Sequence, residues 1–383
     1  MPWKETSIMD QRQEFVSLAR CEGANIRQLC RRFQISPTTA YKWLGRHEQH
    51  AAQGLKDQCR RPHHTPTRSS PDVEASILAV RNTHPKWGAR KIKRVLEDQG
   101  ATGLPATSTV HAILVRHGQI NPQASQAHQS WQRFEHAAPN DLWQMDFKGH
   151  FPLDRGRCHP LTVLDDHSRY ALCLGALSNE GFEATQQRLI QTFRRYGLPA
   201  RMSMDNGSPW GEPGRYTRFE LWLMRLGIQV SHSRPYHPQT QGKDERFHRT
   251  LKAEVLQDQL FRDLFHAQQA FDAWLPVYNR RRPHEALGMA TPMTRYEPSR
   301  RCYPEKLPEL EYGMEDQVRK VQGKGEFSFQ GREYPLGCAF TGCAIAVRHT
   351  EYDEIKAIYF GIHRVASIDV KLQTISIEKT RLK

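Results

Sequence analysis

Residues 141–151, "DLWQMDFKGHF", predict a β-strand that carries an acid in an unexpected place. Apolar side chains alternate with polar ones along it, Trp143 and Met145 against Gln144 and Asp146. This period of two is typical of a strand with one buried face. An ionised carboxylate in the middle of a strand is costly unless something compensates its charge. Asp146 is therefore a candidate functional residue.

The chain on either side of this strand predicts a mixed α/β layer domain. The segment "LTVLDDHSRYALCLGAL" (161–177) predicts a hairpin of two apolar strands around a polar turn. Further elements follow in the order helix, strand, helix, strand, helix, helix, over 182–197, 200–207, 218–227, 228–235, 241–252 and 267–287.

Two more acids come at the ends of such elements. Asp205 ends its strand before an Asn-Gly turn, where a lone Asp is most simply a turn residue. Residues 237–252, "HPQTQGKDERFHRTLK", place Asp244 and Glu245 side by side in the first turn of a helix. Helical phase puts Glu245 on one face with three cationic or basic side chains, those of His248, Arg249 and Lys252.

The same helical phase gives Asp244 a different environment. It shares a face with Phe247 and Leu251, which must pack against the domain, so Glu245 is favoured for chemistry. An acid at the position of Asp244 is most simply explained by the unpaired N–H groups of a helix start. Asp165 and Asp166 form a competing acidic pair, although hairpin turns collect Asp for local hydrogen bonds.

The N-terminal residues 1–50 predict a helix-turn-helix domain. Apolar side chains recur at helical spacing from Ile26 to Phe33, and Ser36 and Pro37 start a second helix whose inner stripe includes Trp43. Short and basic side chains on its outer face are candidates for DNA contact, namely Thr38, Thr39, Lys42 and Arg46. A small helical bundle with a basic solvated face is the alternative.

A second helix-turn-helix domain is predicted over 73–122, after a polar linker at 51–72. Its second helix should begin with Thr107 as N-cap and bury Val110, Ile113 and Leu114. Candidate DNA contacts on the two helices are Arg90, Lys91, Arg94, Ser108 and His111.

The rest of the chain divides by composition. A second polar linker covers 123–138, the α/β domain 139–287, and a Pro-rich linker 288–310. Short β-branched segments from residue 311 to 383 predict a small β-barrel or sandwich. The eight cysteines show no paired zinc spacing, and we expect them to be reduced thiols; Cys59, His63 and His64 could form at most half of a metal site.

The charge indicates the class of partner. The chain of 383 residues has a formal net charge of +14, which favours a polyanion, because each cation set against a phosphate releases counterions. No apolar run has transmembrane length, and the N-terminus lacks the apolar core of a signal peptide. We expect a soluble cytoplasmic protein that binds nucleic acid and no membrane.

As a set, the motifs "WQMDFKG", "DNG" and "RPYHPQTQGKDERFHRTLK" resemble those of the integrase-core, or DDE, transposases of bacterial insertion sequences, relatives of retroviral integrases. The resemblance covers about 139–290 and implies a central ribonuclease-H-like catalytic domain. It implies that Asp146, Asp205 and Glu245 bind two Mg²⁺ ions, for which Mn²⁺ can substitute. It also implies double-stranded DNA as partner, at least a dimer on paired ends, and a nucleoid-associated protein.

The implied reaction is hydrolytic nicking at the ends of the element, followed by attack of the freed 3′-hydroxyls on target DNA. Further roles follow from the resemblance: Asn206 would support Asp205, and the DNA near the cleaved phosphate would be contacted by Gln241, Lys243, Arg249 and Lys252. The segment between Asp205 and Glu245 is slightly longer than is usual in the family, and a shift of register there would favour Asp244.

Two other functions are compatible with parts of this pattern. One is a sequence-specific DNA-binding regulator whose α/β domain is inactive scaffold; the other is a metal-dependent nuclease that cuts but does not join. An acid in mid-strand argues against the regulator, because a binding module of this positive charge has no need of it. The nuclease shares the metal site and differs only in the nucleophile that it presents.

Overall fold

The computed structural model describes residues 7–58, 68–120, 135–205, 207, 210–211, 214–232, 242–257 and 259–379. The chain divides into two compact units, Met1–Arg68 and Ser69–Lys383, and each is treated by itself. No described helix is long and apolar enough to cross a membrane.

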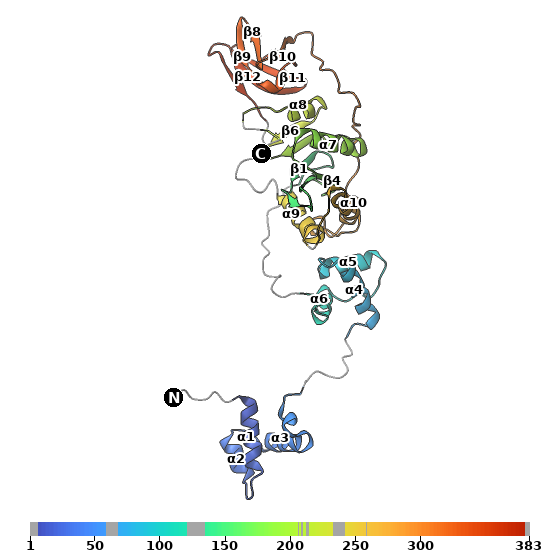
Figure 1. The fold of residues 1–383 in the computed structure, drawn as a ribbon, viewed down its shortest axis with the longest axis vertical. Helices are drawn as coiled ribbons and strands as arrows, with labels where there is room; N and C mark the ends of the chain where they lie inside the picture. Colours follow the sequence, from blue (N-terminus) through green and yellow to red (C-terminus); the bar gives the residue numbers. More distant parts are fainter. Residues whose placement is uncertain are drawn as a thin grey trace. The chain divides into compact units, whose positions relative to one another are not determined.

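The first unit is a bundle of three helices, α1 (Ile8–Ala19), α2 (Ile26–Arg32) and α3 (Pro37–His50), followed by a 3₁₀ turn, η1 (Ala51–Leu55) (Figure 1). The predicted start of α3 is confirmed, because the Ser36 hydroxyl accepts the Thr39 N–H and Pro37 is the first helical residue. The core of this bundle consists of Phe15, Val16, Cys30, Ala40, Trp43 and Leu55.

The second unit begins with another three helices, α4 (Pro71–Thr83), α5 (Ala89–Asp98) and α6 (Thr107–Arg116). Val110, Ile113 and Leu114 are buried among them, as predicted. The expectation that Thr107 is an N-cap was wrong. The first helical hydrogen bond runs from the Val110 N–H to the Ala106 carbonyl (3.0 Å), so Ala106 is the cap and Thr107 is already helical.

The central sheet is mixed, as the sequence predicted. Its strands are β1 (Leu142–Phe147), β2 (Phe151–Pro152), β3 (Arg157–Asp165), β4 (Ala171–Leu177), β5 (Arg201–Met204) and β6 (Gln229–His232). They lie in the order β2-β3-β1-β5-β6, with β4 also paired to β3. β1 is antiparallel to β3 and parallel to β5, and β5 is parallel to β6. The β3–β4 pair is the predicted hairpin.

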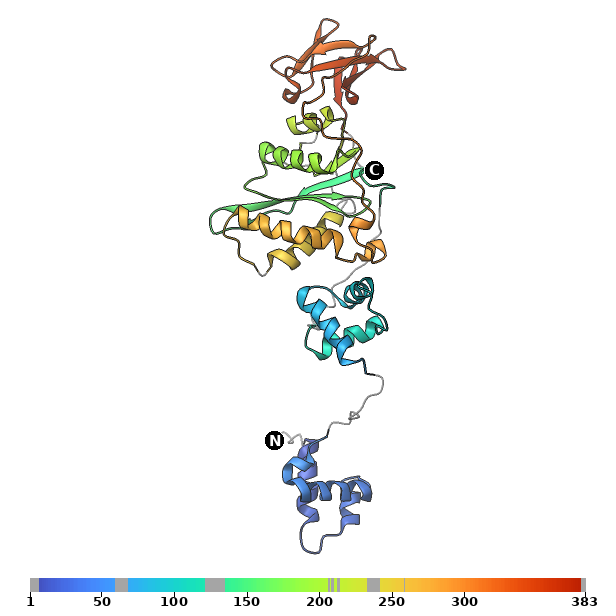
Figure 2. The same ribbon diagram turned by 90° about the vertical axis from the view of Figure 1, so that its right-hand side faces the viewer.

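Helices cover both faces of this sheet (Figure 2). α7 (Phe182–Tyr196) and α8 (Arg218–Arg225) lie on one face; α9 (Gly242–Leu251), the π-helical turn η4 (Lys252–Leu256) and α10 (Leu264–Arg280) lie on the other. Trp143 and Met145 of β1 are buried in the core with α7 and α8. The alternate residue Asp146 therefore faces the α9 side.

The C-terminal strands are all antiparallel. After the 3₁₀ turns η5 (Glu285–Leu287) and η6 (Pro292–Thr294) come β7 (Gln317–Lys320), β8 (Glu326–Phe329), β9 (Arg332–Pro335), the turn η7 (Cys338–Phe340), β10 (Ala344–His349), β11 (Ile355–Phe360), β12 (His363–Asp369) and β13 (Thr374–Ile377). They form a five-stranded sheet in the order β13-β12-β11-β10-β7 and a separate β8–β9 hairpin. In the described part of the chain β13 does not pair with β7, so the predicted barrel is not closed.

The C-terminal strands and the α8 face of the central domain share one apolar core. Tyr216, just before α8, packs edge-on against Phe340 at 5.5 Å, and the His363 ring contacts the Met224 carbonyl at 3.0 Å. The connector between the two domains lies along the core as well, since Arg301 donates to the Pro199 and Leu226 carbonyls. The C-terminal strands are thus packed onto the helix layer that supports β5 and β6.

Candidate active site

Asp146 lies on β1, as its sequence pattern predicted, but near the end of the strand and not in its middle, and its side chain is 22% exposed. Burial, reinforced by the charge of Asp205, raises the pKa of Asp146 to about 7, and Glu180 and Glu245 act in the same direction. The Phe147 N–H opposes this shift. The carboxyl is thus a partly desolvated acid in a negative environment.

Asp205 and Glu245 approach this acid from two other elements. β5 runs parallel to β1, so Asp205, which follows β5, lies at the same edge of the sheet as the end of β1. Glu245 is exposed in the first turn of α9. Both raise the pKa of Asp146, which places three carboxylates in one neighbourhood.

The donor set is suited to a hard divalent cation. Magnesium prefers carboxylate oxygens, and a cation would relieve both the burial of an uncompensated charge and the repulsion among the acids that together raise the pKa of Asp146. Among the described residues, no three acidic, His or Cys side chains converge closely enough to hold a metal ion. Two predicted members of the site, Asn206 and Gln241, lie outside the described residues.

Asp244 packs with Phe247 and Leu251, as its helical phase predicted, and is 2% exposed. Its Oδ1 has no hydrogen-bond partner among the described residues. Burial, followed by the charges of Asp146 and Asp166, raises its pKa well above the usual value. Asp244 is therefore a buried acid on the packed face of α9, a position that disfavours the charged form of its carboxyl.

His248 lies in an environment that the sequence did not predict. Helical phase grouped it with the DNA-facing cations, but its ring lies 3.8 Å from the Asp146 carboxylate and 2.8 Å from the Thr162 hydroxyl. That hydroxyl donates to the Asp146 carbonyl, so Nε2–H of His248 donates to the hydroxyl oxygen. Burial lowers the pKa of His248 to about 4, which keeps the ring neutral.

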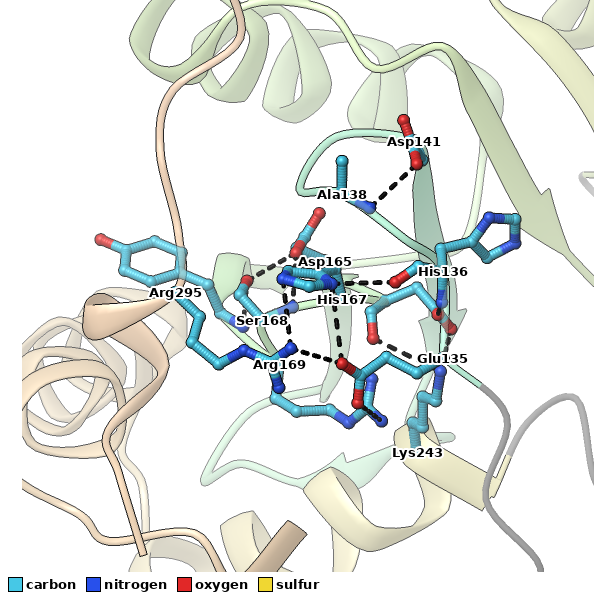
Figure 3. A network of polar contacts seen from close by, with 12 residues as sticks. Glu135, His136, Ala138, Asp141, Asp165, His167, Ser168, Arg169, Lys243 and Arg295 are labelled. Carbon is cyan, nitrogen blue, oxygen red and sulfur yellow. Dashed lines mark hydrogen bonds and ion pairs between the residues drawn. The ribbon is translucent and has the colours of Figure 1, made fainter. Parts of the chain in front are cut away.

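Lys243 is likewise placed differently from the expectation. Its ammonium forms an ion pair with the buried carboxylate of Asp166, and its side chain is only 14% exposed (Figure 3). Asp166 also accepts the His136 N–H and the Gln144 side-chain amide, both at 2.8 Å. In this arrangement Lys243 fixes the first turn of α9 to the β3–β4 turn.

The competing acids Asp165 and Asp166 are thus both buried and engaged by other residues of the domain. Asp165 accepts a hydrogen bond from the Asn140 N–H. It also accepts hydrogen bonds from the N–H and the hydroxyl of Ser168 (Figure 3). These bonds hold the β3–β4 turn, as expected of hairpin Asp residues. Both residues are only 1% exposed.

The predicted DNA contacts fall into two groups. Thr38, Lys42, Arg90, Ser108, His111, Arg249 and Lys252 are exposed. Three others are engaged within the protein, Thr39 with Ser36, Arg46 with Gln58 and Arg94 with Asp98, and Lys91 is half-buried. Burial, together with Arg282, lowers the pKa of Lys91 to about 8.

A basic cleft of about 470 Å³ lies between the α4–α6 helices and the α9–η4 segment. Its lining includes four cations and one acid, Arg81, Lys86, Arg249, Arg282 and Glu254. The Arg282 guanidinium is oriented by Glu254 at 3.0 Å. Such a surface suits a phosphate backbone.

Models of known families match three stretches of the chain, 11–114, 136–292 and 316–376. Models described as "Integrase core domain" match residues 136–238 and 226–292. A helix-turn-helix model matches 11–63, a homeodomain-like model matches 39–114, and the C-terminal domain of IS481 family transposases matches 316–376.

Curated relatives include insertion-element proteins and retroviral polyproteins. The chain is 23% identical over 247 residues to an uncharacterized 39.2 kDa protein of insertion element IS476 from Xanthomonas euvesicatoria, covering 62% of this chain and 68% of that protein. It is 26% identical to a putative transposase of IS5376 from Geobacillus stearothermophilus, covering 52% and 51%. A Gag-Pro-Pol polyprotein of sheep pulmonary adenomatosis virus is 32% identical, covering 33% and 7%.

Among solved structures, the HTLV-2 integrase catalytic core domain in complex with magnesium is 18% identical, with a TM-score of 0.33, covering 42% of this chain and 97% of that one. The chain spans about half the length of the IS5376 relative and of an IS407 protein from Burkholderia multivorans, at 51% and 54%. Helix-turn-helix units, an integrase core and an IS481-type C-terminal domain thus occur together in one chain, which supports its assignment to the DDE, or integrase-core, transposases of insertion sequences.

Proposed function

We propose that this transposase binds the ends of its insertion sequence, nicks them by metal-dependent hydrolysis and joins the freed 3′-hydroxyls to target DNA. The observation that carries the proposal is the environment of Asp146, whose pKa is raised to about 7 by burial and by Asp205 and Glu245. A desolvated carboxyl among like charges is stable only if it is neutral or shares a cation. A divalent cation bound between these acids would compensate their charges.

In this proposal Asp146, Asp205 and Glu245 are the metal-binding catalytic acids, with Asn206 supporting Asp205. Two Mg²⁺ ions, or Mn²⁺ in their place, would supply Lewis-acid stabilisation of the phosphate charge. The protein's own contribution is to hold the acids in place. His248 packs α9 against β1 through Thr162 and Asp146, and Lys243 ties the same helix to Asp166.

DNA would be held by the helical units and by the basic face of α9. Exposed Arg249 and Lys252 lie one and two turns after Glu245, where they can contact phosphates beside the acids. Gln241 would approach the same DNA. Thr38, Lys42, Ser108 and His111 would recognise the ends, and the basic cleft would hold the backbone between the second helical unit and the core.

The proposed organisation keeps helix-turn-helix domains at 1–50 and 73–122, the catalytic core at 139–287 and a DNA- or protomer-binding β domain at 311–383. At least two protomers would act together, because two ends must be brought to one target. We place the activity on double-stranded DNA of the bacterial nucleoid.

The test is an assay with labelled end DNA, a supercoiled plasmid and Mg²⁺, comparing the unmutated protein with Asp146→Asn. We expect nicked ends and joined products with the former and neither with the latter. Nicking without joining would identify a nuclease, and binding without nicking would identify a regulator. Products from Asp146→Asn would contradict the assignment of the acids.

A further inference from the structure

The backbone of Asp205 is held by a buried histidine. His232 ends β6, the strand next to β5, and is 3% exposed. Its Nδ1 lies 3.0 Å from the Asp205 carbonyl oxygen, which can only accept, so Nδ1–H donates. Its Nε2 lies 2.7 Å from Oε1 of Glu220. The orientation of this ring therefore depends on Glu220.

Glu220 is fully buried in the first turn of α8, where a carboxylate needs compensation. Its Oε2 accepts the Thr217 N–H at 2.7 Å, which forms the capping box of α8. Its Oε1 is shared by His232 and the ammonium of Lys379, which lies 2.9 Å away. Lys379 is thus the cation beside a buried acid that also orients His232.

Lys379 comes from a distant part of the chain, the segment that follows β13 of the C-terminal domain. The Tyr216 hydroxyl donates to the Glu378 carbonyl, and the Tyr216 ring lies 5.2 Å from the Lys379 ammonium. Gly211 closes the site. A Cβ there would lie 3.0 Å from the ammonium, 3.1 Å from Oε2 of Glu220 and 3.2 Å from the His232 ring.

We propose that the segment after β13 positions the catalytic acid Asp205 through the series Lys379, Glu220 and His232. The inference rests on the proposed function of Asp205. If Lys379 leaves, the buried Glu220 loses a cation and draws the His232 ring toward itself, and the Asp205 carbonyl loses its donor. Lys379, Glu220 and His232 are positioning residues, and the C-terminal domain becomes a condition for an organised metal site.

The test measures the Mg²⁺ concentration that gives half of the full thermal stabilisation of the full-length protein, without DNA or turnover. In Lys379→Met we expect this concentration to rise roughly 10-fold, the effect typical of losing a residue that orients a metal ligand. Lys379→Arg should remain near the unmutated value, because it keeps the charge. The matched control is Lys371→Met, whose exposed ammonium pairs with Glu354 in the same domain.

A second variant tests the same inference if Lys379→Met fails to fold. Tyr216→Phe removes the hydrogen bond to the Glu378 carbonyl but keeps the ring, and it should raise the Mg²⁺ requirement in the same direction. End-DNA affinity should not change in either variant.

Two outcomes would separate the possible errors. A lower melting temperature in Lys379→Met and Tyr216→Phe with an unchanged Mg²⁺ requirement would overturn the inference and leave a purely structural tie. Asp146→Asn, measured in parallel, should lose the Mg²⁺ response. If it keeps the response, the proposed metal site is wrong, whatever the Lys379 variants do.

Discussion

The imidazole of His248 on α9 lies 3.8 Å from the carboxylate of Asp146 on β1, and the ring is neutral because burial lowers its pKa to about 4. The contact joins the helix that carries Glu245 to the strand that carries Asp146. This contact helps to fix the distance between Glu245 on the helix and Asp146 on the strand.

Replacing His248 by Ala should therefore affect stability and cleavage together. The Thr162 hydroxyl loses a partner in a buried site, and we expect the free energy of unfolding to fall by about 1–3 kcal/mol. Denaturant unfolding measures the loss. Arg249→Ala, at the exposed neighbouring position, should leave stability unchanged and weaken DNA binding. Equal stability of both variants would contradict this role of His248.

The raised pKa of Asp146 predicts a pH-dependent stability of the metal-free protein. Between about pH 4 and pH 7 the folded state binds a proton that the unfolded state has lost, so this carboxyl's contribution is present at low pH and lost as the pH rises to 7. At pH 8, Asp146→Asn should be more stable than the unmutated protein by roughly 1–3 kcal/mol. At pH 4 the two should unfold alike. A difference independent of pH would contradict the assigned shift.

Lys243→Met tests whether this residue anchors α9 or contacts DNA. Removing the ammonium leaves Asp166 buried without its cation, which should destabilise the protein by about 3–5 kcal/mol. Adding Asp166→Asn should restore much of that loss. Denaturant unfolding of the two single variants and the double variant gives the coupling free energy between Lys243 and Asp166. If Lys243→Met lowers only DNA affinity, the sequence-based prediction of a DNA contact is right.

The exposed cations of α9 should appear in the salt dependence of DNA binding. If Arg249 and Lys252 each contact one phosphate, each single replacement by Ala should make the log–log slope of affinity against salt concentration shallower by about 0.9. Arg194→Ala is the control. This exposed arginine belongs to α7, on the opposite face of the sheet from α9, and it pairs with Glu305. If Arg249→Ala and Lys252→Ala leave the slope as unchanged as Arg194→Ala does, then α9 does not contact the DNA.

The sequence predicted those parts of the molecule that depend on local pattern. The alternation around Asp146 and the helical phase of Asp244 are periodic signals, and the structure confirms the strand and the burial of Asp244. Thr107 was misplaced by one residue, because a cap depends on where the first helical hydrogen bond forms. Closure of the C-terminal sheet depends on edge pairing that no local pattern records.

The partners of buried charges could not be predicted in the same way. Lys243, His248 and Lys379 all look like solvated cations in a basic chain, yet each lies against an acid that is distant in sequence. The one available signal was the i+3 relation of His248 to Glu245. The contact with Asp146 required the register of α9 on β1.

The central claim is that Glu245, and not its neighbour Asp244, acts with Asp146 and Asp205. The most direct measurement compares Glu245→Gln with Asp244→Asn in the strand-joining assay with Mg²⁺. Asp244 is buried on the packed face of α9 with Phe247 and Leu251, so Asn, which has nearly the same shape, should keep this packing and joining should persist. Glu245→Gln should abolish joining while end-DNA binding persists. Joined products from Glu245→Gln, together with their loss in Asp244→Asn, would contradict the account.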